Sequence, residues 1–237
     1  MSRKRIALMV VWVALTPGLL RAAEPAKRGP REALQPFNDL IGAWRGTGEP
    51  EGTRAEKQKG FWVESINWSW AFKGDDAWLT TTFDKSKYFA KGELRYLPDK
   101  DAYQLTLTTV DKEKQTFSGK LDDRRLTLTR EDEAKKETQQ IVFTLLHSNR
   151  YLYRYEVKPE GKSGFAKQYQ VGVTKEGVPF AEGDGKPECI VSGGLGTIRV
   201  SYKGETYYVC CGGCRDEFNA EPEKYIKEFN EKKKKKP

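Results

Sequence analysis

Four cysteines are the side chains in this sequence whose type and spacing could do chemistry. Cys189 stands alone, and Cys210, Cys211 and Cys214 follow after a gap of twenty residues. Thiolates gathered at one point bind soft or borderline metal ions such as Zn²⁺ or Cu⁺. In an oxidising compartment the same thiols instead pair as disulfides. The cysteines therefore predict a metal site, with a disulfide or a redox-active thiol as the alternatives.

The segments around these cysteines predict a compact module. Residues 198–209 alternate apolar and polar side chains on both sides of a turn, which predicts a β-hairpin. Residues 215–229 carry apolar side chains at helical spacing, with a proline suited to a first helical turn. The hairpin would bring Cys189 near the strand end that carries Cys210. The two glycines before Cys214 would let it fold back at the start of the helix.

The C-terminal segment resembles the YHS/TRASH family of small, treble-clef-like metal-binding modules. The resemblance rests on nine residues in the family's spacing: Tyr202, Gly204, Tyr207, Tyr208, Cys210, Cys214, Phe218, Pro222 and Tyr225. It implies binding or sensing of a heavy metal, with Cys189, Cys210 and Cys214 as ligands. Cys211 stands where the family often has serine, so it is either a fourth ligand or a bystander. The glycine-rich segment after Cys189 also departs from the family's tighter form.

The larger part of the chain predicts antiparallel β-structure. Period-two alternation, separated by short turn clusters, recurs along the chain. The expected strands lie near residues 41–48, 59–72, 76–84, 90–97, 102–110, 113–120, 124–130, 137–146, 150–157 and 165–174. Because all connections are short, consecutive strands pair as hairpins. The pattern favours an up-and-down barrel, with a β-sandwich as the alternative.

A Gly-x-Trp-x-Gly pattern at Gly42, Trp44 and Gly46 opens this region. With the strands that follow, it resembles the calycin barrels, which include lipocalins and nitrobindin-like proteins. The resemblance implies a barrel over residues 36–176 in which Trp44 closes one end, and an interior that could hold an apolar small molecule. Nitrobindin-like barrels ligate haem iron through a histidine. His147 is therefore a candidate haem ligand, and a solvated turn histidine is the alternative.

The first 23 residues match a secretory signal peptide. Residues 3–5 are basic, residues 6–20 are mostly apolar, and Ala22 and Ala23 offer a cleavage site. The apolar stretch is short for a membrane span. We expect a periplasmic or extracellular protein without a transmembrane span after cleavage, and an uncleaved N-terminal anchor is the alternative.

The net charge of +8 does not predict nucleic-acid binding. The basic excess lies at the two ends of the chain, and residues 24–231 hold one more acid than base. A nucleic-acid-binding face needs basic residues clustered on the folded surface. The lysines of residues 231–237 predict a solvated, disordered basic tail. Polar composition predicts linkers at 24–35 and 177–188, which leaves residues 189–230 as the cysteine module.

Motifs of common enzyme classes do not occur in this sequence. There is no G-x-S-x-G, HExxH or P-loop pattern, and the single histidine limits acid–base chemistry. We therefore expect no enzymatic activity. The prediction is a mainly β, exported protein that binds Zn²⁺ or Cu⁺, with an attached ligand-binding or structural barrel. The alternative is a secreted, disulfide-stabilised structural or interaction protein whose barrel binds an apolar small molecule.

Overall fold

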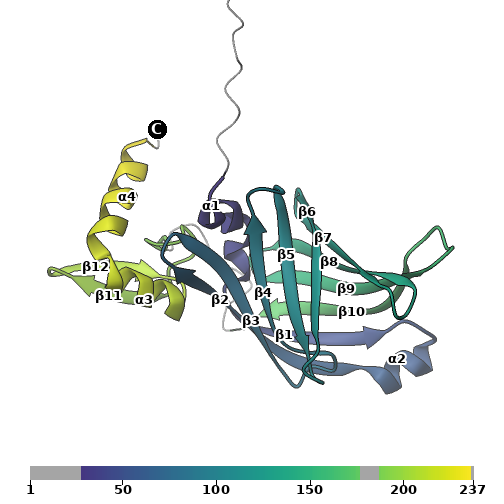
Figure 1. Cartoon of the computed structure of the whole chain (residues 1–237). Helices are drawn as coiled ribbons and strands as arrows, with labels where there is room; N and C mark the ends of the chain where they lie inside the picture. Colours follow the sequence, from purple (N-terminus) through teal and green to yellow (C-terminus); the bar gives the residue numbers. More distant parts are fainter. Residues whose placement is uncertain (1–27, 177–186, 236–237) are drawn as a thin grey trace, which may run out of the picture.

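The computed structural model describes residues 28–176 and 187–235. The predicted signal peptide and residues 177–186 of the predicted linker lie outside the described residues. Within the described ranges, a closed antiparallel barrel of ten strands is followed by a small unit of two strands and two helices (Figure 1). The predicted fold class is confirmed.

The ten barrel strands follow one another in sequence around the barrel. Each pairs with its neighbours in the chain, and β1 closes the barrel by pairing with β10. The barrel is therefore up-and-down, and the sandwich alternative is wrong. The strands are β1 (Gly42–Pro50), β2 (Trp62–Lys73), β3 (Asp76–Asp84), β4 (Phe89–Leu97), β5 (Ala102–Thr109), β6 (Lys114–Asp122), β7 (Arg125–Asp132), β8 (Glu137–His147), β9 (Arg150–Pro159) and β10 (Ala166–Lys175).

Large aromatic side chains fill the centre of the barrel. Alternate residues of β2 are buried, as the period-two pattern predicts, and Trp68 and Trp70 are each 1% exposed. Trp44 is also buried, and its ring meets Tyr151 edge to face with centroids 4.9 Å apart. The predicted structural role of Trp44 in packing therefore fits its position. Burial of these rings supplies a large share of the hydrophobic stabilisation of the barrel.

One end of the barrel is covered by a helical segment. It consists of α1 (Pro30–Leu34) and a 3₁₀ helix, η1 (Gln35–Leu40), and its apolar side chains Leu34 and Phe37 are fully buried. The predicted linker at 24–35 is wrong for residues 30–35, because an open barrel end gives even a few apolar side chains a place to be buried. A second short helix, α2 (Arg54–Gly60), precedes β2, so this strand begins three residues later than predicted.

The C-terminal unit contains the predicted hairpin and two helices. The hairpin is β11 (Ile198–Tyr202) with β12 (Glu205–Val209), and it is followed by α3 (Gly212–Ala220) and α4 (Pro222–Lys235). The two helices are separated by a single non-helical residue, Glu221, directly before Pro222. The predicted disordered tail is wrong as far as Lys235, because α4 continues to that residue. No helix among the described residues is long and apolar enough to cross a membrane.

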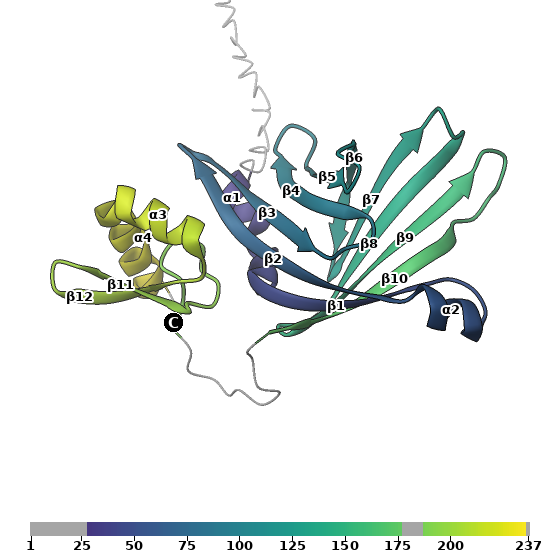
Figure 2. The same ribbon diagram turned by 90° about the horizontal axis from the view of Figure 1, so that it is seen from below.

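The C-terminal unit lies against the end of β2 that extends beyond its pairing with β1. Strand β1 pairs with β2 only as far as Trp68, so residues 69–73 of β2 have no strand partner on that side. Helix α3 packs there, and Figure 2 shows α3 beside the end of β2. Unpaired strand edges are normally covered or blunted in native proteins, and here the C-terminal unit does the covering.

Candidate metal centre

Three cysteine sulfurs converge in the C-terminal unit. The Sγ atoms of Cys189, Cys210 and Cys214 all lie within 4.8 Å of one another, and those of Cys210 and Cys214 are 3.5 Å apart. Zinc–sulfur bonds of 2.3 Å place two ligands of a tetrahedral site about 3.8 Å apart. The three side chains therefore fit a thiolate-bound ion. All three are buried, and Cys214 has no exposed surface.

A tight loop places Cys189. The backbone amide of Cys189 donates to the carbonyl of Gly194 at 2.6 Å, and the amide of Gly193 donates back to the carbonyl of Cys189 at 2.9 Å. Gly193 has a φ of 78°, a conformation that glycine adopts without strain. The amide of Ile190 donates to Tyr208 of β12, so the loop is fastened beside the strand that leads to Cys210.

The other two cysteines are placed by the end of the hairpin and the start of a helix. Cys210 directly follows β12, and Cys214 lies in the first turn of α3. This is the arrangement that the sequence predicts for the two residues. The loop, the hairpin and the helix start together bring residues 25 positions apart to one point.

Ser192 belongs to this cluster, and the sequence analysis did not identify it. It is fully buried, its hydroxyl lies 3.4 Å from the Sγ of Cys210, and its amide donates to the Sγ of Cys189 at 3.4 Å. Hydrogen bonds of this kind favour sulfur in its thiolate form. A signal was present in the sequence, because Ser192 follows Cys189 at the spacing of a C-x-x-C metal knuckle.

Cys211 faces the barrel. Its Sγ accepts a hydrogen bond from the backbone amide of Trp70 in β2 at 3.4 Å. It lies 3.9 Å from the Sγ of Cys210 but outside the group of three mutually close sulfurs. Cys211 therefore contacts both the barrel edge and the cysteine cluster, where hydrogen bonds with Cys210 and Cys214 reach its sulfur.

Contacts among the thiols shift their acidities in opposite directions. Hydrogen bonds from Cys210 and Cys214, with a further one from the Ser192 amide, lower the pKa of the Cys189 thiol. Burial raises the pKa of Cys214, and its contacts with the other thiols raise it further. All four cysteines are free thiols in the structure. Hydrogen bonds from Cys210 and Cys214 likewise lower the pKa of Cys211, to about 3. The contacts therefore favour thiolates at Cys189 and Cys211 before an ion supplies any charge of its own.

A comparison with protein families identifies the helix-and-hairpin part of this unit. Residues 197–228 match the YHS domain. The match includes Cys210, Cys211 and Cys214 and begins after Cys189, which the loop described above brings to the same point. The YHS domain and the cysteine cluster together indicate metal binding.

Comparisons of the whole chain add little. No curated protein matches it. Among solved structures, the S-type phycobiliprotein lyase CPES from Guillardia theta is similar at 10% identity. That match covers 60% of this chain and 92% of the lyase, with a TM-score of 0.38.

The candidate haem ligand lies far from the YHS domain in sequence and at the rim of the barrel. His147 ends β8 and is exposed, next to the two-residue turn that leads to β9. The structure therefore places His147 at the surface, where it does not meet the cysteines.

A pocket opens at the barrel end opposite α1. It has a volume of about 520 Å³ and lies between the starts of β4, β8 and β10 and the ends of β5 and β9. Tyr88, Tyr169 and Tyr155 line it as a stack, with ring centroids 4.2 and 5.4 Å apart. Tyr169 is only 4% exposed, and its hydroxyl has no hydrogen-bond partner within the described residues.

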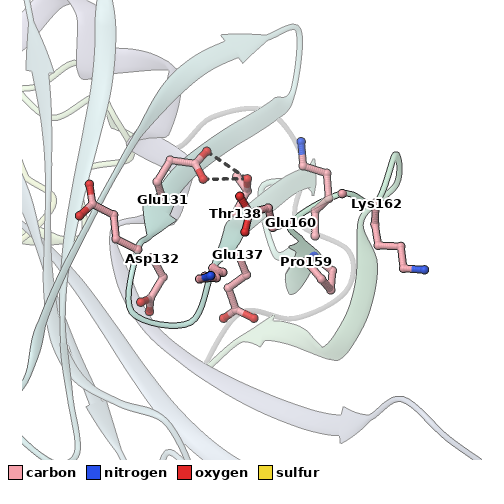
Figure 3. Close-up of a pocket in the computed structure, with 11 residues that line it drawn as sticks. Glu131, Asp132, Glu137, Thr138, Pro159, Glu160 and Lys162 are labelled. Carbon is pink, nitrogen blue, oxygen red and sulfur yellow. Dashed lines mark hydrogen bonds between the residues drawn. The ribbon is translucent and has the colours of Figure 1, made fainter.

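A second hollow lies on the outside of the barrel, between the β7–β8 turn and the β9–β10 connection. Figure 3 shows that acidic and basic side chains surround it. The Glu131 carboxylate accepts hydrogen bonds from the Thr138 hydroxyl at 2.9 and 3.0 Å. Asp132 is paired with Arg130 at 2.6 Å. These acids are held by neighbours in the barrel, and no cysteine lies among the residues that line the hollow.

Proposed function

We propose that this chain is an exported, non-enzymatic protein that binds one Zn²⁺ or Cu⁺ ion through Cys189, Cys210 and Cys214. The convergence of three buried sulfurs within 4.8 Å of one another carries the proposal. The match of residues 197–228 to the YHS domain supports it. Thiolate ligands select soft and borderline ions, and both Zn²⁺ and Cu⁺ belong to that class.

Native mass spectrometry of the reduced full chain tests the metal site. We expect one ion per chain in the wild type, and loss of that ion in Cys214→Ser, because two sulfurs do not hold it in competition with buffer and chelator. The comparison variant is Cys211→Ser, which keeps the three converging sulfurs and an acceptor for the Trp70 amide, so we expect it to keep the ion. A wild-type chain without metal, or one lighter by about 2 Da for each disulfide, would contradict the proposal.

Export is supported by the basic, apolar and small-residue pattern of residues 1–23. N-terminal sequencing of protein recovered from the periplasm or medium of the expressing cell tests it. We expect the mature chain to begin at Ala23 or Glu24. A chain that retains its first residues in the cytoplasm would contradict export and would leave the metal proposal standing.

The barrel supports a second function, binding of a small molecule at its open end. The ligand we propose is flat, partly apolar and carries a hydrogen-bond acceptor, because stacked tyrosine rings surround a hydroxyl that has no partner within the described residues. Burial raises the pKa of Tyr169 well above its usual value, so the hydroxyl stays a donor. This differs from an apolar ligand at the barrel centre, where aromatic side chains are packed.

The dye 8-anilinonaphthalene-1-sulfonate is a suitable probe, because it combines flat rings with an acceptor group. We expect saturable binding of one dye to the wild type and weaker binding to Tyr169→Phe, which removes only the hydroxyl. The control is Phe61→Ala, which changes a side chain that is 58% exposed. Equal binding by all three proteins would contradict the assignment to this pocket.

A further inference from the structure

The barrel reaches the cysteine cluster through the backbone of one residue. Trp70 lies in the part of β2 that β1 leaves unpaired. Its amide donates to the Sγ of Cys211 at 3.4 Å. A buried amide at a strand edge needs an acceptor, and this thiol supplies it. Cys211 therefore joins the two units, because its sulfur also lies 3.9 Å from that of Cys210.

The side chain of the same residue reaches the cluster by a second route, through Asn38 and Ser192. The Trp70 indole donates to the Oδ1 of Asn38 at 3.1 Å, and the Nδ2 of Asn38 donates to the carbonyl of Ser192 at 3.0 Å. Ser192 in turn contacts the Sγ atoms of Cys189 and Cys210. A continuous chain of hydrogen bonds thus runs from the barrel core to two of the three converging sulfurs.

The backbones of the two units meet at a glycine. A Cβ atom on Gly213 would lie 1.8 Å from the carbonyl oxygen of Trp70, far inside van der Waals contact. A Cβ on the preceding Gly212 would meet nothing within 4 Å. Only a residue without a side chain allows α3 to approach β2 at this point. Gly213 directly precedes Cys214, so the close approach is also next to the cluster.

A third contact lies farther along the interface. The guanidinium of Arg31 in α1 pairs with Glu228 of α4 at 2.5 Å and lies over the ring of Tyr225, 5.5 Å from its centroid. The interface therefore extends beyond the cysteines and includes the segment that covers the barrel end. This arrangement differs from two domains joined only by a linker.

We propose that the barrel is part of the metal centre: Trp70 and Asn38 position its ligands, Cys211 is the docking residue, and metal binding and docking stabilise each other. This rests on the proposed function of the cysteine cluster. Residues that hydrogen-bond to the metal-ligating side chains, without touching the ion themselves, contribute strongly to metal affinity. Metal binding and docking of the C-terminal unit favour the same arrangement of the ligands, so each increases the equilibrium constant of the other by the same factor.

The test compares Gly213→Ala with Gly212→Ala in the full chain. Affinity is measured for Zn²⁺ and Cu⁺ separately, in reducing buffer, by competition with a chromophoric chelator. Docking is measured as hydrogen exchange of the β2 peptide that contains Trp70, with metal and with chelator. Gly213→Ala adds a methyl group where the Trp70 carbonyl leaves no room, and it keeps all four cysteines in the chain. Gly212→Ala adds the same group in open space.

We expect metal to slow exchange of the Trp70 peptide in the wild type and in Gly212→Ala. In Gly213→Ala we expect metal affinity to fall about 10- to 100-fold, as for loss of a ligand-positioning group, and the protection to disappear. The coupling would be overturned if Gly213→Ala bound metal with wild-type affinity. It would also be overturned if metal did not change hydrogen exchange of the Trp70 peptide in the wild type. A wild type that binds neither ion would overturn the proposed function and the coupling with it.

A second variant guards against misfolding of Gly213→Ala. Asn38→Ala breaks the hydrogen-bond chain from Trp70 to Ser192 and introduces no clash. Its control is Asn67→Ala, which changes an exposed side chain of the same type in β2. We expect Asn38→Ala to bind metal more weakly than Asn67→Ala, with the same loss of protection at Trp70. Equal affinities in these two variants would contradict the positioning role of Asn38.

Discussion

The amide of Trp70 in the barrel donates a hydrogen bond to the Sγ of Cys211 in the YHS domain, 141 positions away in sequence. The amide belongs to a strand edge that has no neighbouring strand on that side. The thiol therefore satisfies a backbone group that would otherwise be buried without an acceptor. This relationship makes the barrel edge and the cysteine cluster parts of one packed interface.

Replacement of Cys211 by valine should destabilise the protein even without metal. Cys211→Val leaves the Trp70 amide buried without an acceptor, which costs about 1–3 kcal/mol. Cys211→Ser keeps an acceptor and should lose less. Urea unfolding of both variants in reducing buffer with chelator measures the difference. Identical midpoints for the two variants would show that the hydrogen bond contributes nothing.

Tyr153 should stabilise the barrel through Glu64. Both side chains are buried, and the tyrosine hydroxyl donates to the Glu64 carboxylate at 2.5 Å. Burial and the nearby Glu64 raise the pKa of Tyr153 well above its usual value, so it stays a donor. Tyr153→Phe leaves one carboxylate oxygen unpaired and should cost about 1–3 kcal/mol in thermal or urea unfolding.

The control for that experiment is Tyr155→Phe. Its hydroxyl has no hydrogen-bond partner within the described residues, so its removal should change stability little. If both variants unfold alike, the buried Tyr153–Glu64 pair does not contribute as proposed.

Helix α1, which covers the barrel end, should contribute to the stability of the fold as part of the hydrophobic core. Leu34 of α1 is fully buried, and Leu34→Ala should reduce the free energy of unfolding by about 2–5 kcal/mol, as expected for a cavity in a packed interior. Glu32→Ala changes an exposed neighbour on the same helix and should have little effect. Chemical denaturation distinguishes them, and a linker-like α1 would make the two variants equivalent.

Asp101 should make stability depend on pH in the acidic range. Hydrogen bonds from Tyr96, Arg28 and Lys120 lower its pKa to about 2. Because an unfolded aspartate has a pKa of about 3.9, the folded state is favoured above that pH, and this contribution is lost as the pH falls toward 2. The difference in urea midpoint between wild type and Asp101→Asn should therefore be full at pH 7 and close between about pH 4 and pH 2.

The control for pH dependence is Asp75→Asn, in the exposed turn between β2 and β3. It makes the same replacement of a carboxylate by an amide in an exposed turn, so the general effect of that replacement can be subtracted. If the difference in urea midpoint between the wild type and Asp101→Asn did not shrink on acidification, the Asp101 carboxylate would not stabilise the folded state as proposed.

Much of the barrel could be predicted from local patterns. Alternation of apolar and polar residues in segments such as β2 indicates a strand with one buried face. Because the turn between Lys73 and Asp76 is short, β3 can pair with β2 only in the antiparallel direction. The sequence did not distinguish α1 from a linker, because only Ala33 and Leu34 are apolar there. Their burial depends on the open end of a barrel formed by distant strands.

The sequence by itself determined the order of strands and the hairpin and helix of the YHS domain, whereas the family resemblance implied Cys189, Cys210 and Cys214 as ligands and left Cys211 open. The strand order, the hairpin and the helix follow from local periodicity and from residue spacing. Only the tertiary structure decided that Cys211 turns to Trp70, that Ser192 joins the sulfurs, and that Gly213 must lack a side chain. The contact of Ser192 depends on the loop that folds back beside the hairpin. The contacts of Cys211 and Gly213 depend on the unpaired edge of β2, and that edge exists only after the strands have assembled.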